Sequence, residues 1–450
     1  MRSTPPHTIV VGAGLAGLSA GVRLVDAGHR VTILEREQHV GGRTGNWTED
    51  GMPVETGLHR YLGFYVELPR LLRHVGAALN DVVTWTDEVE MRLPDGGPSA
   101  VYATSLIHRP FASIARGLGN NHYVGLGQKL ALARMIGAGA LAYLRHPSEL
   151  DHVSVADYAR RHGVADATIK RILYPLTEGL FFVPPDEYSA HNFMGILVPY
   201  WNSVIKTRVG SFAGGMTDVM CAPMARYVTD HGGEVRTGVT VERLAGGQVR
   251  ITGVVTADGT IDADDVVLAA SLGPAKNIVK ETLGDHPWFS DMQRLSSTPA
   301  VCFQAELDRP CLPKDRATFG PGTDLGSFAE QSRTTFKELD GRLSVIMAQP
   351  HKYVDATAEQ LTPVVIDEAK RLGIGLEGRI VRASVIVIPD DFYSLRVGNE
   401  HLRPAQETPV PGLALAGDYT RQKYLATMEG AVVSGKRAAD AVITRRKEER

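Results

Sequence analysis

The stretch HTIVVGAGLAGL, from His7 to Leu18, decides the fold of this 450-residue chain. Its β-branched run ends at Gly12, which predicts a buried parallel strand, and the apolar residues from Leu15 to Ala27 predict the helix that follows. Gly12 permits a tight turn, Gly14 lets the backbone approach a phosphate, and Gly17 lets the helix pack closely on the strand. Because the free N–H groups at a helix start favour an anion, we expect a dinucleotide-binding turn here.

A second strand and an acidic residue complete this pattern. Residues 31–36, VTILER, predict the strand, and Glu35 follows Gly14 by 21 positions. A carboxylate at that distance can accept hydrogen bonds from both ribose hydroxyls of a dinucleotide. Since strand, helix, second strand and acid occur in order, the signal is more specific than the glycine motif alone.

The composition excludes several classes of function. The length exceeds one ordinary core, so we expect two intertwined domains or one domain with a large insertion. Hydrophobic residues make up 43% and charged residues 22%, as in a soluble globular enzyme, and the net charge of -3 argues against nucleic-acid binding. Three cysteines without a ligand spacing predict no metal site. The first strand begins by His7, which leads us to expect a cytoplasmic protein without a signal peptide.

Two glycine-containing segments follow the second strand. Residues 41–44, GGRT, combine a glycine pair with the arginine Arg43, which suits a second phosphate contact, although an ordinary glycine turn is the alternative. Residues 54–65, VETGLHRYLGFY, are rich in aromatics and carry one histidine, His59. Such a segment suits backbone lying against a flat ring in an apolar cavity, or else a simple core cluster.

The middle of the chain has a different character. Residues from Leu126 to Leu144 predict a long apolar helix, but one too polar and too short to predict a membrane-spanning segment. It is either a core helix of an inserted domain or an amphipathic helix lying on a bilayer. The segment 180–185, LFFVPP, with Phe193, Tyr200 and Trp201, is either core or the wall of a hydrocarbon tunnel.

The alternation of strands and helices then resumes. A helix is predicted from Thr217 to His231, a strand from Gly233 to Val241 and a buried strand from Asp265 to Ala270. In a two-domain flavoprotein this part belongs to the first Rossmann unit, with Val239 near the adenine. Residues 295–389 alternate with period two and contain a predicted helix from Thr357 to Leu372, which indicates a sheet-and-helix substrate domain.

The C-terminal return, residues 412–436, is the most specific stretch. Its strand ends in Gly417-Asp418, where Asp418 can hold a ribityl hydroxyl. A helix beginning near Met428 can direct its N–H groups and its dipole at the electron-rich pyrimidine edge of a flavin. A simple NAD domain has no use for such a return, so FAD is the expected dinucleotide.

Three motifs together resemble a known family. Residues 416–431, AGDYTRQKYLATMEGA, residues 55–59, ETGLH, and residues 41–44, GGRT, are similar to the plant-type phytoene and ζ-carotene desaturases of the flavin amine oxidase superfamily. The resemblance implies FAD, an apolar isoprenoid substrate and hydride transfer from an allylic carbon to flavin N5. The implied cofactor-binding residues are Gly12, Gly14, Ala16, Gly17, Glu35, Arg36, Gly42, Arg43, Thr44, Gly57, Leu58, His59, Val239, Gly417, Asp418, Met428 and Gly430.

The resemblance also implies an architecture. The expected fold is α/β, with a GR2-type Rossmann FAD-binding domain built from three separate pieces, residues 1–100, 205–290 and 405–450. Residues 101–204 form a helical insertion that faces a membrane in one of the two interpretations. Residues 291–404 form a mixed-sheet substrate-binding domain.

Several functions remain open at this stage. The leading hypothesis is a desaturase or dehydrogenase of a large apolar substrate, reoxidised by a quinone or dioxygen, since no second GxGxxG motif suggests a nicotinamide. The alternatives are a peroxide-producing amine oxidase, a hydroxysqualene dehydroxylase-like enzyme, or a lipid-binding flavoprotein without turnover. Amine oxidases of the superfamily place an aromatic before the Met-Glu-Gly step, where this chain has Ala426-Thr427. Candidate proton acceptors are His59, Tyr419 and Tyr424, with structural roles equally open, and Glu429 is expected to cap a helix or orient the cofactor.

Overall fold

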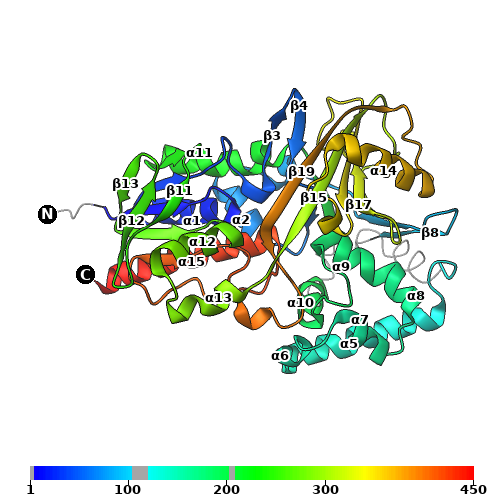
Figure 1. Cartoon of the computed structure of the whole chain (residues 1–450), viewed down its shortest axis with the longest axis horizontal. Coiled ribbons are helices and arrows are strands. Elements are labelled where there is room, and N and C mark those ends of the chain that lie inside the picture. The colour runs from blue at the N-terminus through cyan, green and yellow to red at the C-terminus, as the bar shows by residue number, and fades with distance from the viewer. Residues whose placement is uncertain (1–4, 104–119, 202–207, 450) are drawn as a thin grey trace.

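The computed structural model describes residues 5–103, 120–201 and 208–449. Figure 1 shows two sheet-containing regions, with both chain ends beside the first, and a group of helices below the second. The predicted α/β class is confirmed. The chain crosses between the two sheets more than once, so each region is assembled from distant segments.

The first region contains a five-stranded parallel sheet in the order β10-β2-β1-β14-β20. Its strands are β10 (Glu234–Arg236), β2 (Arg30–Leu34), β1 (His7–Val11), β14 (Asp265–Leu268) and β20 (Leu413–Leu415). Every residue of β1 and β14 is buried, because helices such as α1 cover one face of the sheet while the strands of residues 241–262 and residues of 272–283 cover the other, which explains the continuous apolar runs in the sequence.

Helix α1 (Leu15–Asp26) lies against the C-terminal helix α15 (Met428–Glu448) through small residues. A Cβ atom added to Gly17 would lie 1.9 Å from the Gly12 carbonyl oxygen. One added to Gly435 would lie 2.0 Å from the Ala16 carbonyl oxygen. The predicted role of Gly17 in close packing is therefore confirmed, and α15 needs a glycine for the same reason.

The second region contains a seven-stranded sheet in the order β19-β15-β18-β17-β16-β7-β8. All its neighbours are antiparallel except the β16–β7 pair. The strands are β19 (Ile380–Tyr393), β15 (Ser297–Leu307), β18 (Gly341–Met347), β17 (Leu325–Glu330), β16 (Ala317–Phe319), β7 (Glu88–Arg92) and β8 (Ser99–Ala103). Helix α14 (Ala358–Arg371), capped by Thr357, packs its apolar side on this sheet.

The domain boundaries differ from the sequence interpretation in one place. Strand β7 lies within residues 1–100, which were assigned to the FAD-binding domain, and β8 ends at the start of the predicted insertion. In the structure, β7 pairs with β16 and β8 pairs with β7, so both strands complete the seven-stranded sheet. The local pattern of this hairpin, an alternation of polar and apolar residues, does not show which sheet it joins. Its place in a sheet is decided by the strand it pairs with, which lies far along the chain.

From Leu126 to Trp201 the insertion consists of helices and their connections (Figure 1). Its elements are α5 (Leu126–Arg145), α6 (Pro147–Leu150), α7 (Val155–Arg161), α8 (Asp166–Thr168), η2 (Ile169–Leu173), α9 (Tyr174–Phe181) and α10 (Ala190–Trp201). The helix expected from Leu126 to Leu144 is thus confirmed as α5. Among the described residues, none of the helices has the length and apolarity needed to cross a membrane. The side chains of Tyr200 and Trp201 lie outside the described residues.

Smaller elements connect these regions. An antiparallel three-stranded sheet follows β10, a hairpin follows the phosphate loop, and a second three-stranded sheet joins residues far apart in the sequence. These elements are η1 (Gly42–Thr44), β3 (Asn46–Glu49), β4 (Met52–Glu55), β5 (Tyr61–Leu62), α2 (Glu67–His74), α3 (Leu79–Val82), β6 (Val83–Trp85), β9 (Val209–Phe212), η4 (Thr217–Cys221), α11 (Ala222–Asp230), β11 (Val241–Gly246), β12 (Ile251–Thr256), β13 (Gly259–Asp262), α12 (Leu272–Leu283), η5 (Pro287–Phe289), α13 (Ser290–Arg294), η6 (Gln331–Arg333), η7 (Pro350–Lys352) and η8 (Glu400–Leu402).

The contact at Gly17 gives a direct test of the first region. Gly17→Ala places a methyl group inside the van der Waals radius of the Gly12 carbonyl, so we expect loss of the folded protein or destabilisation of about 3 kcal/mol or more. Gly137→Ala on α5 is the control, because a Cβ there meets nothing within 4 Å. In this exposed helix position it should be neutral or stabilise by up to about 1 kcal/mol. Urea unfolding of both variants measures the difference, and equal stability would contradict the packing argument.

Candidate active site

The main candidate site is a cavity of about 940 Å³ at the carboxyl ends of β1 and β2. It extends from Glu35 and Val239 at one end, past the glycine turns, to Thr427 and Met428 at the start of α15. The carboxyl edge of a parallel sheet is where such folds bind nucleotides. Of the residues expected to bind the cofactor, those that line this cavity are Gly12, Gly14, Ala16, Glu35, Arg36, Gly42, Arg43, Thr44, His59, Val239, Gly417, Asp418 and Met428.

Four expected cofactor residues do not line the cavity. Gly17 serves the packing of α1, as described above. A Cβ atom on Gly430 would lie 2.2 Å from the Tyr424 carbonyl oxygen, so this glycine is needed for close packing within the C-terminal return. Gly57 is buried next to Ile346, and Leu58 packs in an apolar cluster with Cys302. The contacts of these four residues are therefore packing contacts.

Glu35 occupies the end of the cavity where an adenosine ribose is expected. Its carboxylate accepts one hydrogen bond from the Ala13 N–H at 2.7 Å and one from the Glu37 N–H at 3.0 Å. A carboxylate offers about four acceptor sites, so about two remain for ribose hydroxyls. The Val239 N–H donates to the Glu35 carbonyl oxygen at 2.8 Å, which fixes the opposite wall.

The phosphate position is built from two approaching backbone segments. Gly14 and Gly41 form an isolated parallel bridge, and a Cβ on Gly14 would come no closer than 3.9 Å to Gly41. The first turn of α1 contains no acidic residue, and Gly14 provides no side-chain cap, so the N–H groups of this turn are not capped by a neighbouring side chain. Gly42 has φ +52°, a conformation that favours glycine. These features fit a pyrophosphate.

The far end of the cavity is formed by the start of α15, which begins at Met428 as predicted. Thr427 caps the helix by accepting the Gly430 N–H at 3.1 Å. Met428 and Ala431 line the cavity, so the positive end of the helix dipole adjoins it. This arrangement fits the electron-rich edge of an isoalloxazine, and the cavity as a whole fits FAD.

Arg43 and Asp418 form an ion pair across the cavity, although 375 residues separate them. Asp418 is almost fully buried, and the Arg43 guanidinium carbon also lies 4.7 Å from the ring centroid of Phe392. A guanidinium is a planar cation with five N–H donors and no acceptor, so the chemistry of Arg43 suits a phosphate. The pair therefore ties the glycine loop to the C-terminal return at the centre of the cavity.

His59 lines the cavity and is a neutral side chain. Burial lowers the pKa of His59 to about 4, and the charge of Arg43 adds to this decrease. Its Nδ1 lies 2.8 Å from the Gly57 carbonyl oxygen, which requires the proton on Nδ1 and leaves Nε2 as an acceptor. His59 is consequently a weak base that is well suited to accept a hydrogen bond.

The two tyrosines proposed as proton acceptors lie elsewhere. Tyr419 is completely buried in the main core, its hydroxyl has no hydrogen-bond partner among the described residues, and burial raises its pKa. Tyr424 stacks on Phe64 with ring centroids 6.1 Å apart. Neither tyrosine lines the cavity.

Two structural roles near the site involve long-range partners. The Glu429 carboxylate accepts the N–H groups of Val66, Glu67 and Leu68 at 2.7–2.9 Å, so it caps α2. The sequence indicated a capping role but not that the capped helix is α2.

Arg403 is fully buried, and its guanidinium donates to four carbonyl oxygens between residues 418 and 422. No sequence signal singled out Arg403, because most of its partners are backbone carbonyl oxygens, alongside the Glu400 carboxylate.

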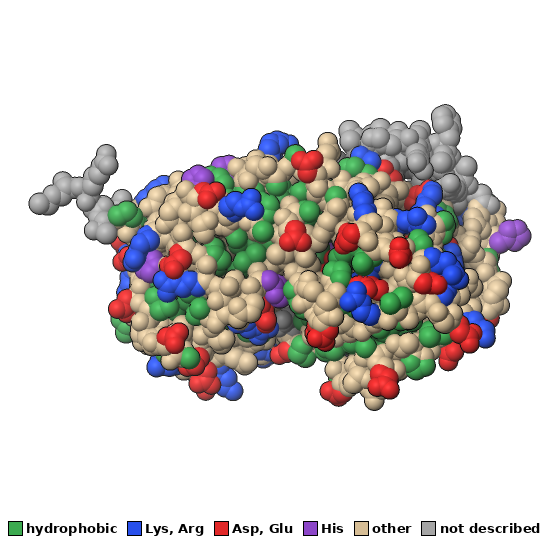
Figure 2. Space-filling view, turned by 90° about the horizontal axis from the view of Figure 1, so that it is seen from above, with side chains coloured by type: hydrophobic (Ala, Val, Ile, Leu, Met, Phe, Trp, Pro, Cys, Tyr) green, Lys and Arg blue, Asp and Glu red, His purple; other side chains and the backbone are tan. Residues whose placement is uncertain are grey.

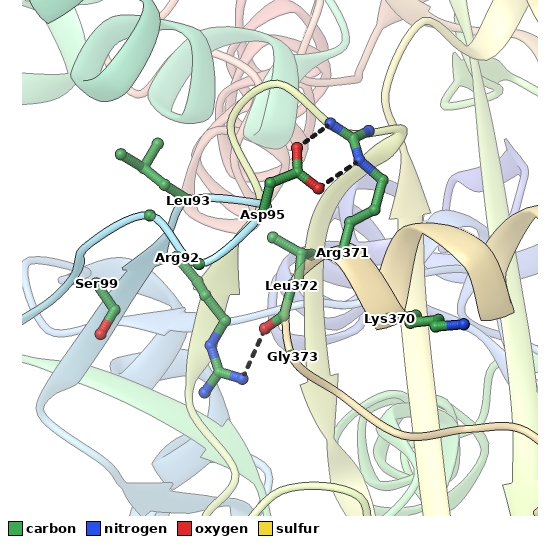
Figure 3. A pocket seen from close by; sticks show the side chains of 10 residues that line it. Arg92, Leu93, Asp95, Ser99, Lys370, Arg371, Leu372 and Gly373 are labelled. Carbon is green, nitrogen blue, oxygen red and sulfur yellow. Dashed lines mark hydrogen bonds and ion pairs between the residues drawn. The ribbon is translucent and has the colours of Figure 1, made fainter.

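A second hollow lies between the β7–β8 turn and the end of α14 (Figure 3). It measures about 540 Å³ and is lined by three basic side chains. Two of them are already engaged, since Arg371 forms an ion pair with Asp95, and Arg92 donates to the Leu372 carbonyl oxygen. We therefore assign the chemistry to the larger cavity.

On the face that Figure 2 shows, acidic and basic side chains are interspersed rather than grouped by sign. Within the described part of the chain, no group of three or more His, Cys, Asp or Glu side chains is placed to hold a metal ion.

Comparison with known proteins identifies the family. The family model described as "Flavin containing amine oxidoreductase" matches residues 15–443. The chain is 28% identical to a 15-cis-phytoene desaturase of Solanum lycopersicum, over 98% of this chain and 78% of the relative. It is 26% identical to a 15-cis-phytoene desaturase of Synechococcus elongatus, over 98% of this chain and 96% of the relative. A putrescine oxidase structure with bound putrescine has the same fold, with a TM-score of 0.74 at 19% identity, over 98% and 100% of the two chains.

The matched segment begins at Leu15, within the dinucleotide turn, and includes Glu35, most of the cavity lining and the C-terminal return, which carry much of the expected chemistry. The chain therefore belongs to the flavin-containing amine oxidoreductase family and is a FAD-dependent oxidoreductase.

Proposed function

We propose that this enzyme desaturates a large apolar substrate of the isoprenoid or carotenoid class and passes the electrons to a quinone or dioxygen. The single observation that carries the proposal is the apolar wall of the cavity. Ile386, Ile388 and Phe392 line it, and they belong to one cluster with Phe182, Ala300, Cys302, Ile346 and Leu58. Such a wall suits a hydrocarbon, and the relatives named above as phytoene desaturases support the same substrate class.

The residues before α15 favour a hydrocarbon over an amine. Ala426 and Thr427 line the cavity, so the position of an amine-binding aromatic is occupied by a methyl group and a hydroxyl. The hydroxyl of Thr427 is already used to cap α15. Ala426 has φ +46° and donates its N–H to the Tyr393 hydroxyl at 3.0 Å, which holds this small side chain in place.

Desaturation requires little acid–base work from the protein. A hydride and a proton leave neighbouring carbons while a C=C bond forms, and bound flavin supplies the chemistry of accepting the hydride at N5. Gly12, Gly14, Glu35 and Arg43 would hold the adenine and phosphate end of FAD. Met428 and the start of α15 would adjoin the flavin end and stabilise negative charge there. The cation left after hydride loss makes the adjacent C–H acidic, so water suffices as the proton acceptor.

His59 has a defined part in this scheme. The Gly57 carbonyl fixes the neutral ring, so that Nε2 can accept a hydrogen bond. Through this acceptor His59 would help to orient the cofactor or the substrate in the cavity. We assign no proton transfer to Tyr419 or Tyr424, because neither side chain reaches the cavity.

Helix α5 provides a surface for a lipid membrane. Leu126, Leu130, Leu141 and Leu144 are 55%, 65%, 50% and 69% exposed. At 100° per residue these four lie within roughly 60° of one another and form a stripe about 27 Å long. The helix contains no acidic residue, and Lys129, Arg134 and Arg145 flank the stripe. We propose that this face lies on an anionic bilayer, where an apolar substrate is dissolved.

The reaction class is tested by anaerobic reduction of the bound flavin. A C40 polyene such as phytoene is expected to bleach the flavin and yield a product with one more double bond, and a quinone should restore the colour. Hydroxysqualene and a panel of amines are the comparisons. Bleaching by an amine, with peroxide released in air, would replace the proposal with an amine oxidase. Tight lipid binding without bleaching would indicate a flavoprotein without turnover.

The protonation state of His59 is tested through stability. Because its pKa falls from 6.5 to about 4 on folding, the neutral ring stabilises the native state above pH 6.5, and this contribution is lost as pH falls toward 4. Urea unfolding of FAD-free protein should therefore show the advantage of the wild type over His59→Gln shrinking between pH 6.5 and 4. Parallel pH curves for the two proteins would show that the folded-state pKa is not lowered.

The membrane surface is tested with a quadruple variant of α5. Replacing Leu126, Leu130, Leu141 and Leu144 with glutamine keeps helix propensity but removes the apolar stripe. Binding to vesicles of phosphatidylcholine and phosphatidylglycerol is expected to weaken roughly tenfold or more in co-sedimentation. The control replaces Val249 and Val381, which are 89% and 64% exposed on other elements, with glutamine. Equal binding by the quadruple variant and the wild type would exclude α5 as the contact.

A further inference from the structure

We propose that Gln304 is a positioning residue, whose side-chain amide fixes the backbone of Glu55 and thereby sets where residues 56–59 lie against the FAD cavity. Gln304 lies within β15 of the substrate-domain sheet, 249 residues from Glu55. It does not itself line the cavity. The effect on the rate of flavin reduction rests on the proposed function, whereas the effects on the spectrum and on FAD affinity do not.

The contact between the two residues is reciprocal. The Glu55 N–H donates to Gln304 Oε1 at 3.1 Å, and Gln304 Nε2 donates to the Glu55 carbonyl oxygen at 2.5 Å. The amide therefore pairs with the peptide groups as a neighbouring strand would. Both residues are almost completely buried, where unpaired peptide groups are costly, so this pairing fixes the backbone strongly.

Neighbouring side chains fix the direction of the amide. Arg342, which is fully buried on β18, donates to Gln304 Oε1. A guanidinium can only donate, so the atom it contacts must be the oxygen, and Nε2 must face the Glu55 carbonyl. Gln331 donates to the Glu55 carboxylate and accepts from Ser344. The sheet thus presents a prearranged polar surface to Glu55.

From Glu55 the chain runs directly into the cavity wall. Thr56 and His59 line the cavity, while Leu58 packs in the apolar cluster that contains Cys302. Thr56 is also tied to the glycine loop, since its N–H donates to the Gly45 carbonyl at 3.0 Å and its hydroxyl to the Arg43 carbonyl at 2.7 Å. The start of the segment is therefore held from two sides, by Gln304 through Glu55 and by the nucleotide loop through Thr56.

The test compares FAD-loaded Gln304→Leu with Gln293→Leu. The first removes both hydrogen bonds to Glu55, whereas the second removes one amide-to-carbonyl hydrogen bond, to Lys276, away from the cavity lining. We expect Gln304→Leu to shift the visible absorption bands of bound FAD and raise its dissociation constant. The rate constant of flavin reduction at saturating substrate should fall roughly ten- to hundredfold, because small misplacements cost that much, with KM changed far less. Gln293→Leu should leave all of these unchanged.

A folded Gln304→Leu protein with the spectrum, FAD affinity and reduction rate of the wild type would overturn the proposal, as would equal changes in Gln293→Leu. If Gln304→Leu does not fold, Gln304→Glu replaces it, because it keeps the acceptor for the Glu55 N–H and for Arg342 and loses only the donor. An unchanged spectrum and FAD affinity in that variant would likewise overturn it. If no substrate reduces the flavin, the desaturase proposal fails, while the spectrum and the dissociation constant still decide the role of Gln304.

Discussion

The close packing of α1 on the first sheet and on α15 is the constraint on which the rest of the structure depends. Gly17 lies so near the Gly12 carbonyl that no side chain fits, and Gly435 has the same relation to Ala16. Both helices begin at the same cavity, α1 beside the glycine turns along its length and α15 at its far end. Two helix N-termini, from opposite ends of the chain, can therefore act on one elongated ligand.

The nucleotide half of the fold was predictable because its signals are local. The roles of Gly12, Gly14 and Glu35 were predicted from the backbone geometry of a tight turn and from the spacing between the turn and the acid. Both signals lie within one short segment and do not depend on remote partners. The helix start at Met428 was predictable for the same reason, since Thr427 is an ordinary capping residue. The family and its FAD cofactor follow from these segments together with the C-terminal return.

The parts that escaped prediction depend on partners far along the chain. The β7–β8 hairpin joins the second sheet only because β16, more than 200 residues later, supplies an edge. Arg403 organises the loop after β20 through backbone carbonyls, which leave no mark in a sequence. Tyr419 follows Asp418 directly, yet its side chain points into the core, and no periodicity distinguishes the two directions in an irregular loop.

The position of β20 and α15 has a consequence for the synthesis of this protein. Strand β20 pairs with β14, and Glu429 caps α2, so the first sheet and a helix of the first hundred residues both require the last forty residues. The N-terminal region therefore cannot complete its fold until β20 and α15 have been made. Before that point in translation, the edge of β14 and the apolar side of α1 lack their partners, which exposes them to aggregation and makes them natural sites for chaperone binding.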